Sequence, residues 1–314
     1  MKIFFAQKHI FSRFHLSIIM YVITGATGHT GKTVAENLLA AGKTVKVIGR
    51  SAEKLSELAA KGATPAVGDL SDAGFLTAAF EGATAVYLMI PPKWDVSNWR
   101  AFQRALIEGF IQALKAARVS KVVLLSSQGA HLLEGAGPVS GLAELEQALR
   151  SVEGLDVLAL RPGYFMENLY ASVGMIQHAG INGSSLSGDV RFPIVHTRDI
   201  AAVATQRLLS LQFTGHTHEF VGGAADLNMR EVTSIVGKAI GKPELPYIQF
   251  SPADAKAGMM QAGLAETIAD GYNELFDALN KGIYQEGYER TPAITTPTTL
   301  EWFVENELKH AFAA

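Results

Sequence analysis

The sequence predicts an α/β protein with a doubly wound parallel sheet, followed by a smaller and mainly helical region. From Met20 onward, short segments rich in Val, Ile and Leu alternate with helical patterns, which is typical of parallel strands joined by crossover helices. A glycine motif directly follows the first of these segments. Of the 314 residues, 48% are hydrophobic and 18% are charged, which suits a folded chain with a sizeable core.

The expected strands are short, and the fourth is a continuous apolar run that we place at the centre of the sheet, buried on both faces. The strands span Tyr21–Thr24, Thr44–Ile48, Thr64–Val67, Ala85–Ile90, Lys121–Leu125 and Asp156–Leu160. The intervening helices are expected from the glycine motif to Leu39, and over Ala52–Lys61, Trp99–Arg118 and Leu142–Val152. Apolar residues recur every three or four positions in the Trp99–Arg118 helix, which predicts a core or subunit-interface face.

Beyond Tyr164 the alternation gives way to a loop-rich stretch over residues 180–188 and then to a mainly helical end. Between these two parts lies the apolar pair Ile194-Val195. After it we expect a helix over Asp199–Leu209, a strand over Glu219–Val221 and a helix over Met229–Ile240. The sequence therefore predicts a first domain over residues 20–165 and a smaller region over 166–314. Part of the smaller region, about residues 194–222, is expected to pack back on the sheet.

Residues 1–19 differ from the rest of the chain. They contain Lys2, Lys8 and Arg13, and the first acidic residue is Glu36. Charges that interrupt the apolar residues argue against a secretory signal, while an organelle transit peptide stays an alternative. Because Met20 stands directly before the first expected strand, we interpret residues 1–19 as a disordered extension or a gene-start artefact.

Composition excludes several classes of protein. The formal net charge of −3 gives no electrostatic reason to expect a nucleic-acid partner. There is no cysteine, so disulfides, thiolate nucleophiles and sulfur-bound zinc are excluded. No apolar run approaches the roughly 20 residues that span a bilayer. We therefore expect a cytoplasmic protein that binds neither nucleic acid nor membranes.

The segment Gly25-Ala26-Thr27-Gly28-His29-Thr30-Gly31 has the form of a dinucleotide-binding loop. The first glycine permits the turn out of the strand, the second lets the backbone approach the pyrophosphate, and the third lets helix and strand pack closely. The phosphates then lie at the positive end of the following helix. A glycine-rich turn alone is weak support, but this one lies between a strand and a helix, as a Rossmann domain requires.

Gly49-Arg50-Ser51 ends the second strand, where a protein that favours NAD presents an acidic residue to the ribose. A guanidinium at Arg50 can instead pair with a 2′-phosphate, with Lys54 one helical turn later. The alternative is a solvated arginine on a loop. The sequence thus favours NADP(H) as cofactor over NAD(H).

Other strand ends supply further candidate cofactor contacts. In Gly68-Asp69-Leu70, the Asp69 carboxylate either accepts a hydrogen bond from the adenine amino group or caps the following helix. Ile90-Pro91 ends the fourth strand, where the backbone commonly lines the cofactor crevice. Trp94 and Trp99 follow, and they form either an aromatic wall over the substrate or packing for the long helix.

The chain resembles the NmrA-like family of atypical short-chain dehydrogenases and reductases. The resemblance rests on Gly25–Gly31, Gly49-Arg50-Ser51, Gly68-Asp69-Leu70, Val122–Ser127, Leu160-Arg161-Pro162-Gly163-Tyr164-Phe165-Met166-Glu167-Asn168, Asp199-Ile200-Ala201 and Gly222-Gly223. It implies a Rossmann fold, NAD(P)(H) binding, and a place near the nicotinamide for Pro162, Gly163, Tyr164 and Phe165.

One feature of the larger superfamily is missing. Its catalytic members carry a Tyr, and a Lys four residues later, on the helix after the fifth strand, as a proton donor and the group that lowers its pKa. If Glu146 aligns with the acidic residue further along that helix, Pro138 and Leu142 occupy those positions. No Tyr-x-x-x-Lys occurs between Ser126 and Arg150.

Three other groups are candidates for polar work in catalysis. Ser126 and Ser127 end the fifth strand. We expect Ser126 to contact the cofactor, and the Ser127 hydroxyl could orient the carbonyl of a substrate, although serines at strand ends often only begin a loop. His131 could protonate the oxygen of a reduced substrate; the alternative is that it is a solvated histidine on a loop. Tyr164 could place its phenol near the nicotinamide ring as a proton donor; the alternative is that its side chain only packs in the core.

Two further polar sites are interpreted as structural. His216 and His218 share one side of a strand but are too few to make a metal site, so we expect no metal. Asp199 is interpreted as a helix cap rather than a catalyst.

Two functions of different class remain. The first is a reductase that transfers hydride from NADPH to a small electrophile such as a quinone, an azo compound or a conjugated carbonyl. The second is a non-catalytic sensor that binds the dinucleotide and regulates a protein partner. Aromatic residues near the crevice favour the reductase, because they predict an apolar pocket. A homodimer or a regulatory protein partner is compatible with both functions.

A chain that begins at Met20 should fold and bind dinucleotide as the full chain does, because the expected first strand begins there. Thermal melting of both chains, with and without NADPH, checks this. A loss of several degrees in the shorter chain would show that residues 1–19 pack on the domain.

Overall fold

The central sheet has seven parallel strands, in the order β3-β2-β1-β4-β5-β6-β10. The computed structural model describes residues 19–313, so the predicted extension lies outside the described residues except for Ile19. The strands span Met20–Ile23 (β1), Thr44–Gly49 (β2), Thr64–Val67 (β3), Ala85–Leu88 (β4), Lys121–Leu125 (β5), Asp156–Pro162 (β6) and His216–Val221 (β10). The strand order reverses between β1 and β4, where a doubly wound sheet opens its binding crevice.

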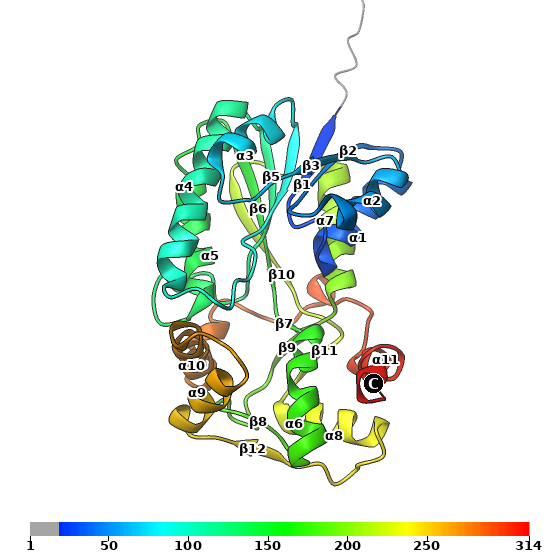
Figure 1. Cartoon of the computed structure of the whole chain (residues 1–314), viewed down its shortest axis with the longest axis vertical. Helices are drawn as coiled ribbons and strands as arrows, with labels where there is room; N and C mark the ends of the chain where they lie inside the picture. Colours follow the sequence, from blue (N-terminus) through cyan, green and yellow to red (C-terminus); the bar gives the residue numbers. More distant parts are fainter. Residues whose placement is uncertain (1–18, 314) are drawn as a thin grey trace, which may run out of the picture.

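Two hydrophobic cores cover the two faces of this sheet. Tyr21 and Ile23 of β1 point into one core and Val22 into the other, as the alternation of a strand requires. Every residue of β4 is buried, which confirms its expected central place. Figure 1 shows α3 (Ala73–Phe80), α4 (Trp99–Ala117) and α5 (Pro138–Leu149) on one side, and α1 (His29–Ala40), α2 (Ala52–Ala60) and α7 (Thr197–Ser210) on the other.

A second lobe lies beyond the carboxyl ends of the strands (Figure 1). It contains a three-stranded sheet, in the order β11-β9-β7, and the pair β12-β8. These strands are Tyr164–Phe165 (β7), Asn182–Ser184 (β8), Phe192–Val195 (β9), Ala225–Leu227 (β11) and Tyr247–Gln249 (β12). The helices are α6 (Val173–Ala179), α8 (Met229–Ala239), α9 (Pro252–Gln261), α10 (Glu266–Asn280) and α11 (Leu300–Asn306), with short 3₁₀ turns over 166–172, 283–285, 292–294 and 308–312.

The chain returns once from the second lobe to the first. After β9, helix α7 packs against α1, and β10 then pairs with β6 along six residues. The sheet is therefore completed only by residues that follow the start of the second lobe.

Several element bounds differ from the sequence expectations. Helix α5 begins at Pro138 rather than Leu142, because Pro138 occupies its first turn, where the fixed φ of proline suits a helix start. Strand β10 begins at His216 rather than Glu219, because residues 216–218 pair with Val157–Ala159. Strand β4 ends at Leu88, two residues before the expected Ile90.

The expected cap role of Asp199 is wrong. The cap of α7 is His196, whose Nδ1 accepts from the Arg198 backbone amide at 3.1 Å. Asp199 is buried and accepts instead from the backbone amide and the hydroxyl of Thr298, at 2.9 and 2.7 Å. It thereby fastens the C-terminal segment to the first lobe.

Asp199→Ala should lower the free energy of unfolding by about 2–3 kcal/mol, because two buried donors of Thr298 lose a charged acceptor. Urea unfolding measures the loss. Asp189→Ala is the matched control, since Asp189 forms an exposed ion pair with Arg230, and it should change stability by less than about 0.5 kcal/mol. Equal effects of the two substitutions would contradict this role of Asp199.

Candidate active site

The glycine loop between β1 and α1 has the close contacts that its sequence predicts. Gly25 has φ +62°, in the left-handed region, and its carbonyl accepts from the Gly28 amide at 2.9 Å. A Cβ on Gly31 would lie 2.4 Å from the Gly25 carbonyl oxygen. Only a glycine at position 31 therefore allows α1 to start so close to the end of β1.

The loop is attached to both neighbouring strands. The Thr24 hydroxyl donates to the Tyr87 carbonyl at 2.9 Å and accepts from the Met89 amide at 3.1 Å. The Ala26 amide donates to Ile48 at 3.3 Å. Thr27, Gly28 and His29 are left exposed on the surface of the loop, whereas Thr30 and Gly31 are buried beneath it. A cradle of backbone groups thus faces outward at the start of α1, which fits the diphosphate of a dinucleotide.

The end of β2 carries unpaired positive charge. Arg50 is exposed, and the Ser51 hydroxyl caps α2 by accepting from the Lys54 amide at 3.3 Å. Within residues 19–313, neither Arg50 nor Lys54 forms an ion pair. The arrangement leaves a guanidinium free beside a helix start, as a 2′-phosphate requires.

Asp69 does not cap α3, because that role belongs to Asp72, which accepts from the Phe75 amide at 2.9 Å. Asp69 accepts from the backbone amide and the hydroxyl of Ser71, at 2.9 and 2.7 Å. The hydrogen bond from the Ser71 amide is the main reason that the pKa of Asp69 is lowered, with smaller contributions from Arg50 and Lys93. Lys93 is a residue that the sequence analysis missed, and it adds positive charge on the loop after β4.

The other expected contacts at these strand ends differ in exposure. Leu70 is buried and Ile90 half-buried, and both pack in the core under α3 and α4. Pro91 follows Ile90 outside β4, on the irregular backbone at the carboxyl edge of the sheet. Adenine contacts at these residues stay a prediction.

Ser126, at the end of β5, is turned away from the crevice. Its hydroxyl is buried and donates to Glu146 of α5 at 2.5 Å. The same carboxylate receives two hydrogen bonds from Arg161, at 3.1 and 2.7 Å. The Ser126 side chain and Glu146 therefore fix β6 against α5, and the Ser126 backbone amide donates to Leu160 at 2.8 Å.

Ser127 has a partner that the sequence analysis missed. Its hydroxyl lies 2.9 Å from the hydroxyl of Tyr284, which follows α10 in the second lobe. The Tyr284 ring covers Gly129, where a Cβ would lie 2.4 Å from the ring. Burial raises the pKa of Tyr284 to about 12. His131 contacts the same segment, because its Nε2 lies 3.0 Å from the Ile283 carbonyl oxygen.

Gln128, which follows Ser127, has a buried side-chain amide without a hydrogen-bond partner among residues 19–313. Its amide nitrogen in the backbone donates to Pro162 at 2.9 Å, which holds the residue beside the end of β6. Its side chain is only 1% exposed, yet neither polar atom has a hydrogen-bond partner within the described part of the chain. Buried amides are nearly always paired, so the residues at this edge fit a polar group such as the carboxamide of a nicotinamide cofactor.

The Pro162–Phe165 segment crosses from the first lobe to the second. The Gly163 amide donates to Val221 at 3.1 Å, and a Cβ on Gly163 would lie 2.3 Å from the Pro193 carbonyl oxygen. Tyr164 packs on Phe192 with ring centroids 5.5 Å apart. Burial is the main cause of the raised pKa of Tyr164, and its hydroxyl makes no hydrogen bond with residues 19–313. Phe165 packs against the core under α1 and α7.

The start of α5 is closely packed against α10. Gly137 has φ +53°, and a Cβ there would lie 1.9 Å from the carbonyl oxygen of Gly271 in α10. The Pro138 carbonyl accepts from Gln103 at 3.0 Å. Helix α10 therefore packs directly on the first turn of α5. The match of Pro138 and Leu142 to the superfamily's Tyr and Lys positions stays a prediction.

The two tryptophans after β4 have different roles. Trp99 is buried at the start of α4 and contacts α10 at Gly271. Trp94 is 47% exposed and stacks on Tyr272 of α10, with ring centroids 6.0 Å apart. Its carbonyl accepts from the Ala265 amide at 3.0 Å. Both residues thus attach the second lobe to the loop at the crevice.

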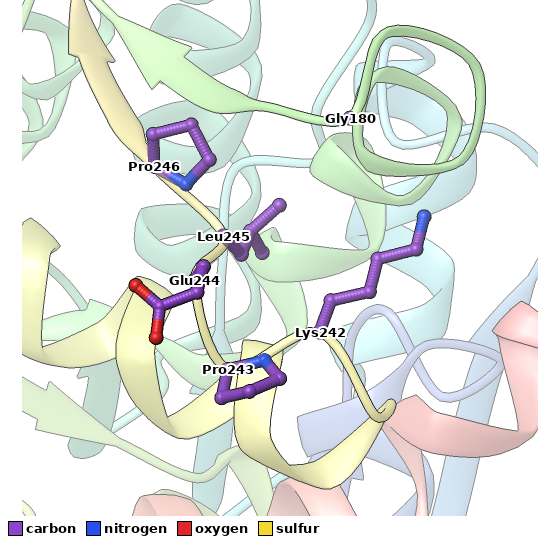
Figure 2. Close-up of a pocket in the computed structure, with 6 residues that line it drawn as sticks. All are labelled: Gly180, Lys242, Pro243, Glu244, Leu245 and Pro246. Atoms are coloured by element: carbon purple, nitrogen blue, oxygen red, sulfur yellow. The ribbon is translucent and has the colours of Figure 1, made fainter.

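Two hollows in the surface lie away from these motifs. One, of about 260 Å³, is lined by Gly180 and residues 242–246, which lead into β12 (Figure 2). The other, of about 420 Å³, lies between the last turns of α4 and α5, at the opposite edge of the sheet from the glycine loop. Neither contains a residue of the cofactor motifs, so we place the site by the strand ends rather than by these hollows.

Residues 19–313 lack two features, a metal-binding cluster and a membrane-spanning helix. No cluster of three or more His, Asp or Glu side chains is arranged to hold a metal ion in this part of the chain. No helix in the same range combines the length and apolar character that crossing a bilayer requires.

Comparisons with known proteins also indicate an NAD(P)H-binding protein. A family model described as NAD(P)H-binding matches residues 25–209. The chain is 31% identical to the NAD(P)H azoreductase of Xenophilus azovorans, over 94% of this chain and 99% of that protein. It is 29% identical to quinone oxidoreductase 2 of Escherichia coli strain K12, over 89% of this chain and 95% of that protein.

Solved structures show the same fold. The crystal structure of an NADPH-dependent quinone oxidoreductase from Escherichia coli, complexed with NADPH, has a TM-score of 0.78 and 25% identity, covering 92% of this chain and 100% of that chain. A triphenylmethane reductase from Citrobacter sp., complexed with NADP(H), has a TM-score of 0.73 and 22% identity, covering 93% and 99% of the two chains. The second likeness concerns the fold alone.

Arg50→Ala should weaken NADPH binding by about 1.5–3 kcal/mol and leave NADH binding nearly unchanged, because a charged contact to the 2′-phosphate is lost. Fluorescence titration of both cofactors measures this. Lys115→Ala, which removes a positive charge at the opposite edge of the sheet, is the control and should affect neither cofactor. Equal weakening of NADPH and NADH by Arg50→Ala would contradict the assignment.

Proposed function

Because the chain belongs to the NAD(P)H-binding family, we propose that it is an NADPH-dependent reductase that transfers hydride to a quinone, an azo compound or a conjugated carbonyl. The resemblance drawn from the sequence is confirmed by this family match and by the likeness to NAD(P)H-dependent reductases. The observation that carries the proposal is the full-length similarity to two enzymes, an azoreductase and a quinone oxidoreductase.

The residues of the first lobe would hold NADPH in an extended position along the carboxyl edge of the sheet. The outward-facing backbone of Thr27–His29 would hold the diphosphate, and the free guanidinium of Arg50 would hold the 2′-phosphate. The buried, unpaired amide of Gln128 and the Pro162–Phe165 crossing would lie at the nicotinamide end. When bound, NADPH supplies the hydride.

The surroundings of that end suit a flat, conjugated acceptor. Trp94 stacks on Tyr272, and Tyr164 packs on the buried Phe192, so three partly exposed aromatic side chains come from the two lobes. Because no Tyr-x-x-x-Lys occurs between Ser126 and Arg150, no such pair is available on α5 to protonate a localised alkoxide. A reduced quinone spreads its negative charge over the ring and can take its protons from water, so orientation beside the hydride donor can replace a positioned acid.

The sensor function has no specific observation in its favour. A sensor and a reductase would bind NADPH through the same residues, so cofactor binding alone does not separate them. Turnover does separate them, because only a reductase consumes NADPH in the presence of an acceptor. A homodimer, a regulatory partner and a cytoplasmic location stay predictions from the sequence.

The purified protein should oxidise NADPH with quinones or azo dyes and fail with simple ketones, because a positioned acid contributes roughly 10²–10⁴-fold to ketone reduction. Absorbance of NADPH against a panel of acceptors measures this. Tight NADPH binding without turnover on any acceptor would instead support the sensor.

Tyr164→Phe tests the remaining phenol at the crossing between the lobes. It should leave quinone reduction nearly unchanged, because the Tyr164 hydroxyl has no fixed partner among the described residues. Tyr170→Phe, which removes an exposed phenol from the following turn, is the control. Ketone reduction that is robust in the wild type and lost in Tyr164→Phe would show that Tyr164 is a relocated acid.

A further inference from the structure

We infer that Tyr284 is a positioning residue for the reaction: it turns the Ser127 hydroxyl into a hydrogen-bond donor aimed at the acceptor beside the nicotinamide. The inference rests on the proposed function. It gives a role in the reaction to a residue 157 positions further along the chain, in the second lobe.

Three contacts fix Tyr284 over the loop that follows β5. Its hydroxyl lies 2.9 Å from the Ser127 Oγ. Its ring rests on Gly129, whose φ of +84° and missing Cβ make room for it. The neighbouring carbonyl of Ile283 is held by His131 at 3.0 Å. The phenol therefore has a defined place relative to Ser127 rather than a loose one.

The direction of the hydrogen bond follows from burial. Tyr284 is only 8% exposed, and its hydroxyl has no other partner among residues 19–313. If Ser127 donated to it, the phenolic O–H would remain buried without an acceptor, which costs about 1–3 kcal/mol. Tyr284 therefore donates, and the Ser127 Oγ accepts. The O–H of Ser127 is then left free to donate elsewhere.

The free O–H lies where charge would develop. Ser127 is half-buried at the carboxyl end of β5, next to Gln128, which is bonded to the end of β6. As hydride reaches the acceptor, its electron pair displaces electrons onto an oxygen or nitrogen of the acceptor. A hydrogen bond from Ser127 stabilises that charge, and donation by Tyr284 strengthens it. Ser127 keeps its proton, and the reduced acceptor is protonated by water.

Tyr284→Phe is the direct test, because it removes one oxygen and keeps the ring on Gly129. With a quinone as acceptor, kcat should fall roughly 3- to 20-fold, whereas the KM for the quinone and the Kd of NADPH stay at their wild-type values. Ser127→Ala should lower kcat roughly 100-fold. The double variant should be no slower than Ser127→Ala, since Tyr284 acts only through Ser127.

Tyr288→Phe is the matched control. It removes a phenol from the same segment, but that phenol donates to Asp226 at 2.9 Å and does not touch Ser127. Its kcat should equal that of the wild type. A Tyr284→Phe enzyme with wild-type kcat, or a double variant whose losses multiply, would overturn the inference.

Binding of 4-nitrophenolate to the protein–NADP⁺ complex gives a readout without turnover. A hydrogen bond from Ser127 should lower the pKa of the bound nitrophenol, seen in its visible absorbance, and Tyr284→Phe should reduce that shift. A shift unaffected by both Tyr284→Phe and Ser127→Ala would count against the inference.

Should Tyr284→Phe fail to fold, a variant with 3-fluorotyrosine at position 284 keeps the ring and the hydroxyl but makes the phenol a stronger donor. Its kcat should rise above that of the wild type, and an unchanged or lower kcat would contradict the role of Tyr284. A wild-type protein that reduces no quinone would contradict the proposed function itself, which keeps the two failures distinct.

Discussion

The backbone contact between Gly137 and Gly271 determines how the rest of the site is built. Neither helix could approach the other if Gly137 carried a side chain, because its Cβ would overlap the carbonyl of Gly271. This contact places α10 over the start of α5. The aromatic side chains Trp94, Tyr272 and Tyr284 are in turn positioned by α10 and the turn that follows it. The packing of these aromatic side chains thus depends on two glycines in contact.

Much of the first lobe could be predicted from the sequence because its signals are local. Strand β4 is a run of apolar residues, and the glycines of the 25–31 loop lie at fixed spacings between a strand and a helix. The place of Arg50 directly after β2 could be predicted by counting along one βαβ unit, whereas its contact with a 2′-phosphate stays a prediction. Such features depend on residues close in sequence, and the structure has them where they were expected.

The polar partners could not be predicted, because they depend on contacts between distant residues. Ser126 and Ser127 are adjacent and identical in type, yet one binds Glu146 of α5 and the other Tyr284 of the second lobe. Asp199 has the sequence position of a helix cap, but Thr298, which is 99 residues away, takes its carboxylate. In both cases the local pattern allows several roles, and tertiary packing selects one.

The position of β10 at the edge of the sheet has a consequence for synthesis of the chain. Residues 20–162 contain six of the seven strands, but β6 has no neighbour on its outer side until residues 216–221 have been made. The face of α1 that packs against α7 likewise stays uncovered until α7 has been made. A nascent chain that has completed only the nucleotide-binding motifs therefore presents an open strand edge and an uncovered apolar face, which are the features that chaperones and aggregation partners bind. The first lobe can consequently be completed only after residues 164–195, which begin the second lobe, have been made.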